Sequence, residues 1–145
     1  MIKELRHVGL VVNNLDESIK FWTEVMDFTI INKLEEHGDH IDKMIGVENL
    51  NIITVKLKSK DGNKLELLHF KSHIDKKRWD GEPFSTGFTH IALTVDNLLH
   101  QIERIKNFGI NFTTSPQKSI DGKVLVIYVK GPEGILIELV ENIDR

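Results

Sequence analysis

The sequence predicts an α+β fold in which two tandem βαβββ modules form an open, curved mixed sheet, and internal repetition is the main reason. His7-Val-Gly-Leu-Val-Val-Asn-Asn-Leu15 matches His90-Ile-Ala-Leu-Thr-Val-Asp-Asn-Leu98, and the segment around Glu66 matches the segment around Glu138. A long-range repeat of this kind indicates a repeated structural unit. Neither half has enough sheet and helix to cover its own apolar face, so we expect one pseudosymmetric domain over residues 1–145.

Module one, residues 1–70, is expected to contain one helix and four strands. Asn14 is placed to cap the helix, with Glu17 as its capping-box partner. The apolar side of this helix recurs at helical spacing through Leu15, Ile19, Trp22 and Met26. Apolar runs rich in β-branched residues favour strands at 5–12, 28–31, 52–58 and 64–70. Asp61-Gly62 marks a turn between the last two strands.

Module two, residues 88–145, repeats this order. Asp96 or Asn97 begins its helix, whose apolar stripe consists of Leu98, Ile102 and Ile105. Strands are expected at 89–95, 110–113, 124–129 and 135–140, and Gly131-Pro-Glu-Gly134 supplies the last turn. The connector between the modules, residues 71–87, is polar and turn-rich and contains Asp80-Gly81 and Pro83.

Charge and composition exclude several classes of function. The chain has 19 Lys and Arg residues against 22 Asp and Glu, a net charge of -3, which does not supply the basic surface that nucleic-acid binding needs. No apolar stretch is long enough to cross a bilayer and no signal peptide is evident, so we expect a cytoplasmic protein without a membrane partner. Because the chain has no Cys, a metal ion would have to be bound by nitrogen and oxygen ligands.

Four residues of the repeat are candidates for chemistry, a His near the start and a Glu near the end of each half. Glu138 is the strongest candidate, because both faces of its expected strand are apolar and a carboxylate there needs a compensating partner. A buried ion pair with a Lys or Arg is the competing interpretation. Glu66 is less decisive because Lys64 shares its face, and a lone His in a strand is usually a packed core residue. The joint recurrence favours an N2O2 ligand set for a divalent metal, made of His7, Glu66, His90 and Glu138.

His37 and His40, in Glu35-Glu-His-Gly-Asp-His40, form a second candidate metal cluster. The segment has turn composition and no counterpart in the other half. We therefore expect a solvated loop there rather than a metal site.

The arrangement resembles the vicinal oxygen chelate superfamily, which includes glyoxalase I and methylmalonyl-CoA epimerase. The resemblance spans nearly the whole chain and rests on His7-Val-Gly-Leu-Val-Val, Leu65-Glu-Leu-Leu-His69, His90-Ile-Ala-Leu-Thr-Val-Asp-Asn-Leu98 and Gly134-Ile-Leu-Ile-Glu-Leu139. It implies a cleft that holds one divalent metal ion, with His7, Glu66, His90 and Glu138 as ligands. It also implies that Glu138 or Glu66 is the general base that moves a proton next to a carbonyl. The ion is open among Ni, Co, Zn, Mn and Fe.

Several activities are compatible with this resemblance. We expect an enzyme with a small-molecule substrate, either a lyase similar to glyoxalase I (lactoylglutathione lyase) or an epimerase or isomerase similar to methylmalonyl-CoA epimerase. Bacterial glyoxalase I has an Arg that helps hold glutathione at the position of Val11, which speaks against glutathione here. The alternatives are a non-catalytic drug-binding protein of the bleomycin-resistance type and an extradiol dioxygenase, although Glu66 stands where dioxygenases have no ligand. Such clefts form within one chain or between two, and we expect a homodimer.

Overall fold

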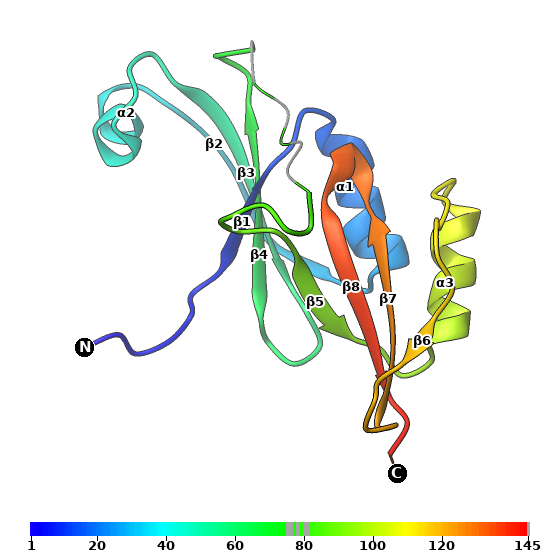
Figure 1. Ribbon diagram of the computed structural model, residues 1–145. Helices are drawn as coiled ribbons and strands as arrows, with labels where there is room; N and C mark the ends of the chain where they lie inside the picture. Colours follow the sequence, from blue (N-terminus) through cyan, green and yellow to red (C-terminus); the bar gives the residue numbers. More distant parts are fainter. Residues whose placement is uncertain (75–76, 78, 80–81, 145) are drawn as a thin grey trace. The chain divides into compact units, whose positions relative to one another are not determined.

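The computed structural model describes residues 1–74, 77, 79 and 82–144, which divide into two compact units, Met1–Lys77 and Arg78–Arg145 (Figure 1). Each unit contains one four-stranded mixed sheet, which confirms the predicted α+β class. The turn predicted at Asp80-Gly81 lies outside the described residues. Within the described ranges, no helix has the length and apolar character needed to span a bilayer.

The first unit places its first strand beside its last, in the order β1-β4-β3-β2 (Figure 1). Strand β1 pairs with β4 in parallel, whereas the other neighbours are antiparallel. A single π-helical turn, Phe21–Val25, extends α1. The elements are β1 (Val8–Val11), α1 (Leu15–Lys20), β2 (Thr29–His37), α2 (Asp39–Ile45), β3 (Asn51–Lys58) and β4 (Lys64–Phe70).

The second unit repeats this topology in the order β5-β8-β7-β6. Strands β5 and β8 are parallel, and a short 3-10 turn, Pro132–Gly134, joins β7 to β8 where a turn is predicted. Its elements are β5 (Ile91–Thr94), α3 (Leu98–Asn107), β6 (Gln117–Lys118), β7 (Val124–Lys130) and β8 (Leu136–Asn142).

Both predicted helix starts are confirmed by their caps. The Asn14 side-chain oxygen accepts a hydrogen bond from the Glu17 N–H at 3.1 Å, and the Asn97 side chain accepts one from the His100 N–H at 2.9 Å. The predicted apolar stripe of α3, Leu98, Ile102 and Ile105, is buried. In the first unit Trp22 is also buried and makes edge-to-face contacts with Phe21 and Phe28, at ring distances of 5.4 and 5.2 Å.

The strand predicted at residues 110–113 is wrong. These residues lie outside every strand, and the corresponding strand, β6, is only Gln117–Lys118. Gly109, with φ of 101°, ends α3 in a conformation that favours glycine. Ile110 and Phe112 are half-buried without belonging to a sheet, so their alternation with polar residues reflects burial rather than strand pairing.

The loop predicted at residues 35–40 is also wrong, although its imidazoles are exposed as expected. His37 ends β2 and His40 lies in α2, with Gly38 (φ 98°) as the break between strand and helix. Asp42 stabilises the new helix, because its carboxylate accepts hydrogen bonds from the Asn49 and Leu50 N–H groups at 2.8 and 2.9 Å. Helix α2 has no counterpart between β6 and β7, a stretch that is described in full.

Side chains alternate along the strands and give each sheet two different faces. One face of the first sheet is buried and contains Val55, Leu57, Leu65 and Leu67. The other face carries Glu66 and Lys56, and toward α2 it becomes apolar, with Ile41, Leu50 and Ile52 packed against Leu68 and Phe70. In the second sheet the buried face contains Ile127, Val129, Ile137 and Leu139. Alternation therefore places Glu66 and Glu138 on the faces opposite these buried rows.

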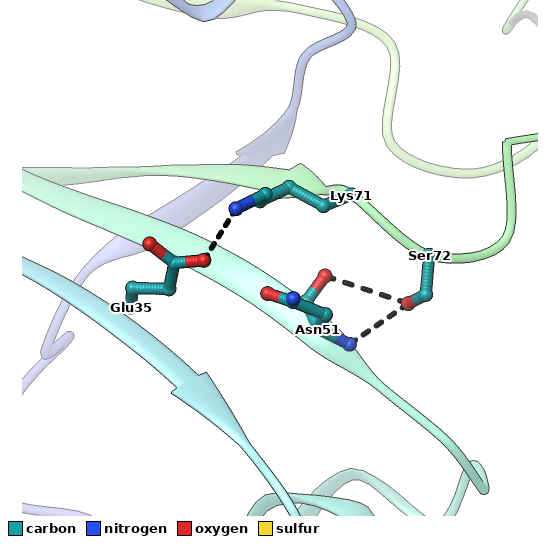
Figure 2. Close-up of polar contacts among 4 residues, drawn as sticks. All are labelled: Glu35, Asn51, Lys71 and Ser72. Atoms are coloured by element: carbon teal, nitrogen blue, oxygen red, sulfur yellow. Dashed lines mark hydrogen bonds and ion pairs between the residues drawn. The ribbon is translucent and has the colours of Figure 1, made fainter.

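A polar cluster connects the strands where β4 leaves the first sheet (Figure 2). The Ser72 hydroxyl accepts a hydrogen bond from the Asn51 N–H at 2.9 Å and donates one to the Asn51 carbonyl at 3.4 Å. The same carbonyl accepts a hydrogen bond from the Lys71 N–H at 2.8 Å. Lys71 also forms an ion pair with Glu35 on the edge strand β2. His69 Nδ1 donates to the Val12 carbonyl at 3.0 Å, so this His has a structural contact after β1.

Replacing Asn14 by Ala removes the acceptor for the Glu17 N–H and should lower the free energy of unfolding by about 1 kcal/mol. Asn14→Asp retains an acceptor at the same position and should keep most of the stability. Urea unfolding followed by circular dichroism measures both variants. Equal stability of Asn14→Ala and the wild type would contradict the capping role.

Candidate functional site

In the first unit, His7, the residue before β1, lies beside Glu66 of the parallel strand β4. Gly9 is the register partner of Glu66, and His7 precedes Gly9 by two residues, so the two side chains share a face. Glu66 Oε1 lies 3.8 Å from His7 Nε2, and Glu66 Oε2 lies 3.8 Å from Lys56 Nζ on β3. The Glu66 side chain is only 14% exposed, so these two neighbours compensate a largely buried carboxylate.

The second unit repeats this geometry around Glu138. Ala92 is the register partner of Glu138, and His90 precedes Ala92 by two residues. His90 Nε2 lies 3.1 Å from Glu138 Oε2. The Thr89 hydroxyl and His90 Nδ1 are 2.9 Å apart, so Nδ1 has a partner of its own while Nε2 faces the carboxylate.

Tyr128 stands directly opposite Glu138 on β7, at the position that Lys56 has opposite Glu66 on β3. Its ring also makes an edge-to-face contact with His90 at 5.3 Å. Burial, followed by a hydrogen bond to Glu138 and the negative charge of Glu138, raises the pKa of Tyr128 above its ordinary value of 10.0. Near neutral pH the phenol is therefore uncharged and serves Glu138 as a hydrogen-bond donor.

The two pairs fit the chemistry of a metal site. With bonds of about 2.1 Å, adjacent ligands lie about 3.0 Å apart on an octahedral ion and about 3.4 Å apart on a tetrahedral one. The 3.1 Å between His90 and Glu138 meets this spacing, and the 3.8 Å between His7 and Glu66 is somewhat wider. Metal ligands are typically oriented by a second residue that contacts the ligand side chain. Thr89 is such a neighbour of His90 at Nδ1, and Lys56 is such a neighbour of Glu66 at Oε2.

The structure brings the four predicted residues together as two pairs, one in each unit. Among residues 1–74, 77, 79 and 82–144, no three His, Asp or Glu side chains gather into a cluster able to hold a metal ion. The shared four-ligand site therefore stays a prediction. The alternative for Glu138 is an ion pair with Lys or Arg; among the described residues its neighbours are His90 and Tyr128, and no Lys or Arg forms an ion pair with it.

Sequence reasoning missed Lys56 and Tyr128. Each lies on the strand antiparallel to the one that carries the Glu, at equivalent register positions. Aligning Ile53-Thr-Val-Lys56-Leu with Leu125-Val-Ile-Tyr128-Val places the two residues together. Because Lys and Tyr differ in chemistry, a comparison that looks for identical residues passes over them.

Tyr128 is the only Tyr in the chain, so an absorbance titration of phenolate reports on this group alone. In metal-free protein we expect a midpoint above 10.0. Glu138→Gln removes the negative charge and should move the midpoint back toward 10.0 without reaching it, because burial is the largest cause of the shift. Glu103→Gln on α3 should change nothing. A wild-type midpoint at or below 10.0 would contradict the contact with Glu138.

Comparison with known proteins identifies the family. Residues 4–139 match the model of the Glyoxalase/Bleomycin resistance protein/Dioxygenase superfamily. The chain is 30% identical over 137 residues to a probable lactoylglutathione lyase of Vibrio parahaemolyticus, which covers 94% of this chain and 88% of that protein. It is 26% identical over 140 residues to a lactoylglutathione lyase of Escherichia coli O157:H7, with coverage of 97% and 93%. The crystal structure of a glyoxalase family protein from Bacillus cereus matches the fold with a TM-score of 0.89, 20% identity and coverage of 98% and 95%. The chain therefore belongs to the glyoxalase/bleomycin resistance protein/dioxygenase superfamily, as its resemblance to the vicinal oxygen chelate proteins predicts.

Proposed function

We propose that the protein is a metal-dependent lyase of the glyoxalase I type, which moves a proton next to a carbonyl group of a small molecule. The observation that carries this proposal is the recurrence of one His–Glu pair at the same register position in both units. A repeated core needs only repeated apolar residues, whereas a repeated pair of ionisable residues points to a functional site. The names of the relatives from Vibrio parahaemolyticus and Escherichia coli favour a lyase over an epimerase.

In this proposal His7, Glu66, His90 and Glu138 hold one divalent metal ion, with Ni, Co, Zn, Mn and Fe as the candidates. The bound ion supplies Lewis-acid polarisation of a carbonyl or enediolate oxygen of the substrate. The chain's own residues present two imidazole nitrogens and two carboxylates. Thr89 orients the His90 ring through its contact with Nδ1, and Lys56 orients the Glu66 carboxylate through its ion pair with Oε2.

Proton transfer is assigned to a carboxylate, and the two candidates differ in their neighbours. Lys56 holds one oxygen of Glu66 by an ion pair, whereas Tyr128 holds Glu138 by a hydrogen bond from an uncharged phenol. A carboxylate that accepts a proton has to change its contacts during the reaction. Protonation of Glu66 would remove its ion pair with Lys56, whereas among the described residues Glu138 has no Lys or Arg partner, so proton uptake by Glu138 breaks no such pair. Glu138 is therefore the first candidate for the general base and Glu66 the second.

The proposed substrate is an adduct of a thiol with a 2-oxo-aldehyde, the class that the name lactoylglutathione lyase implies for the relatives. The thiol is not assigned to glutathione. Val11, which stands where bacterial glyoxalase I has a glutathione-binding Arg, is 57% exposed. An exposed isopropyl group offers no hydrogen-bond donor to a carboxylate.

Protein stripped with a chelator should rebind close to one divalent ion per chain, measured by elemental analysis and by titration with Ni and Zn. His7→Ala and Glu138→Gln should each weaken binding by more than about tenfold, because each removes a ligand rather than a neighbour of one. His40→Ala, which removes an exposed imidazole of α2, is the control and should bind normally.

The same samples decide between the lyase and a non-catalytic protein of the bleomycin-resistance type. No specific metal binding by the wild type, together with tight binding of a substrate analogue by metal-free protein, would favour the binding function. Sedimentation velocity on the loaded protein tests the predicted homodimer, in which the two His–Glu pairs of one site can come from two copies.

Glu138→Gln should slow exchange of the substrate C–H with deuterated solvent by about 10²–10⁴-fold, the usual contribution of a general base. Glu66→Gln should have a smaller effect on this step. NMR of the substrate in deuterated buffer measures the exchange, and metal content is determined for each sample so that ion loss is counted separately. Glu48→Gln is the control. Full exchange in both Glu138→Gln and Glu66→Gln, with metal bound, would refute the assignment.

A further inference from the structure

The face of the first sheet that carries Glu66 changes chemistry along its strands. At the α2 end it is apolar and packs as the cluster of Ile41, Leu50, Ile52, Leu68 and Phe70. Glu66 and its cross-strand partner Lys56 follow. Toward the turn between β3 and β4, the same face ends in Lys58 and Lys64. On this face Glu66 therefore lies between the half-buried Leu68 on the side of α2 and the exposed ammonium groups of Lys58 and Lys64 on the side of the turn.

Lys58 and Lys64 lie directly opposite each other on antiparallel strands, and both are exposed. Like charges in this arrangement destabilise a sheet. In the described part of the chain neither ammonium group has an ion-pair partner. The acidic residue of the intervening turn, Asp61, is engaged by the Ser59 hydroxyl and the Asn63 side-chain amide. The two lysines thus carry uncompensated charge next to the candidate site.

The second unit indicates that the fold does not require this lysine pair. The equivalent register partners there are Lys130 and Leu136. Leu136 is buried in the apolar core, so no like-charge pair forms at this position. The Lys58–Lys64 pair is therefore a property of the first unit alone, in a chain whose net charge is -3.

Lys56 links this pair to Glu66. Its Nζ lies 3.8 Å from Glu66 Oε2, and its side chain is 34% exposed, which leaves it accessible to a ligand. A strand rises about 3.3 Å per residue, which places Lys64 about 7 Å from Glu66 along β4. Lysine ammonium groups bind carboxylate and phosphoryl groups as point charges. A small substrate held at Glu66 has the length to reach them.

We propose that Lys56, Lys58 and Lys64, the lysine cluster, bind an anionic group of the substrate. The Lys58–Lys64 pair lies about 7 Å along the strands from Glu66, and Lys56 lies directly opposite Glu66. The inference rests on the proposed function and deepens it, because it narrows the substrate to a carbonyl compound that carries a carboxylate or phosphoryl group. The uncharged part of the molecule lies toward α2. The lysine cluster thus sets the direction in which the substrate binds.

Two hemithioacetals of methylglyoxal test the inference. The adduct with mercaptoacetate carries a carboxylate, and the adduct with 2-mercaptoethanol is neutral and of similar size. Metal-loaded wild type should have the higher kcat/KM for the anionic adduct. Lys58→Gln/Lys64→Gln should reduce this preference by roughly five- to tenfold, mainly through KM, as expected for two exposed charge contacts.

The matched control is Lys20→Gln/Lys33→Gln, which removes two exposed lysines of the same unit from α1 and from β2. Lys33 pairs with the buried Val55 and therefore lies on the opposite face of the sheet from Glu66. The control should retain the full preference for the anionic adduct. Equal preference in the wild type and in Lys58→Gln/Lys64→Gln would overturn the inference.

A titration of labelled protein with inorganic phosphate and with acetate, followed by NMR, needs no turnover. Amide shifts at residues 56–64 that occur in the wild type and the control but not in Lys58→Gln/Lys64→Gln support the anion site, and the ion that binds more tightly identifies a phosphoryl or a carboxylate group. If the metal-loaded protein is inactive but still binds these ions at residues 56–64, the proposed lyase activity is refuted and the anion site stands. Absence of local shifts would overturn the anion site even in an active enzyme.

Discussion

In each unit a strand from the start of the repeat pairs in parallel with a strand from its end, β1 with β4 and β5 with β8. This pairing brings together a His and a Glu that are far apart in sequence. A parallel pair needs a long crossover, which the intervening helices and two strands provide in each unit. The register matters as much as the pairing. A slip by one residue would move the Glu66 side chain to the other face of the sheet, among the buried side chains now supplied by Leu65 and Leu67. The buried rows therefore hold each carboxylate on the face where its His lies.

Burial next to these apolar rows makes the neighbours of each carboxylate important. Glu66 and Glu138 are both shielded from bulk water, with side chains 14% and 21% exposed, so each needs compensation. The first unit supplies an ammonium group from Lys56 and the second a phenol from Tyr128. The need to compensate each carboxylate also explains the positions of Lys56 and Tyr128. Each lies directly opposite its Glu on the neighbouring antiparallel strand, where side chains of adjacent strands come closest together.

The sequence predicts most of the fold because repetition and caps are local signals. Residues 64–70 are bounded correctly as a strand, and Asn14 and Asn97 cap the predicted helices. The sequence does not predict helix α2, because seven residues are too few to show a helical period. The Asp42 contacts that stabilise the helix are with the N–H groups of Asn49 and Leu50, just beyond its end. The His–Glu pairs follow from the repeat, whereas Lys56 and Tyr128 depend on cross-strand register, which periodicity does not specify.

The repeat preserves the His–Glu pair and changes what surrounds it, and this difference has a consequence for substrate orientation. If the proposed site had two identical halves, an unsymmetrical substrate would bind in two orientations of equal energy. Lys56 beside Glu66 and Tyr128 beside Glu138 remove this equivalence, because one half presents a cation and the other an uncharged donor. Lys58 and Lys64 increase the difference, since the second unit has Lys130 and the buried Leu136 at these positions. Unequal neighbours thus suit the proposed reaction, in which only one of the two carboxylates takes the proton.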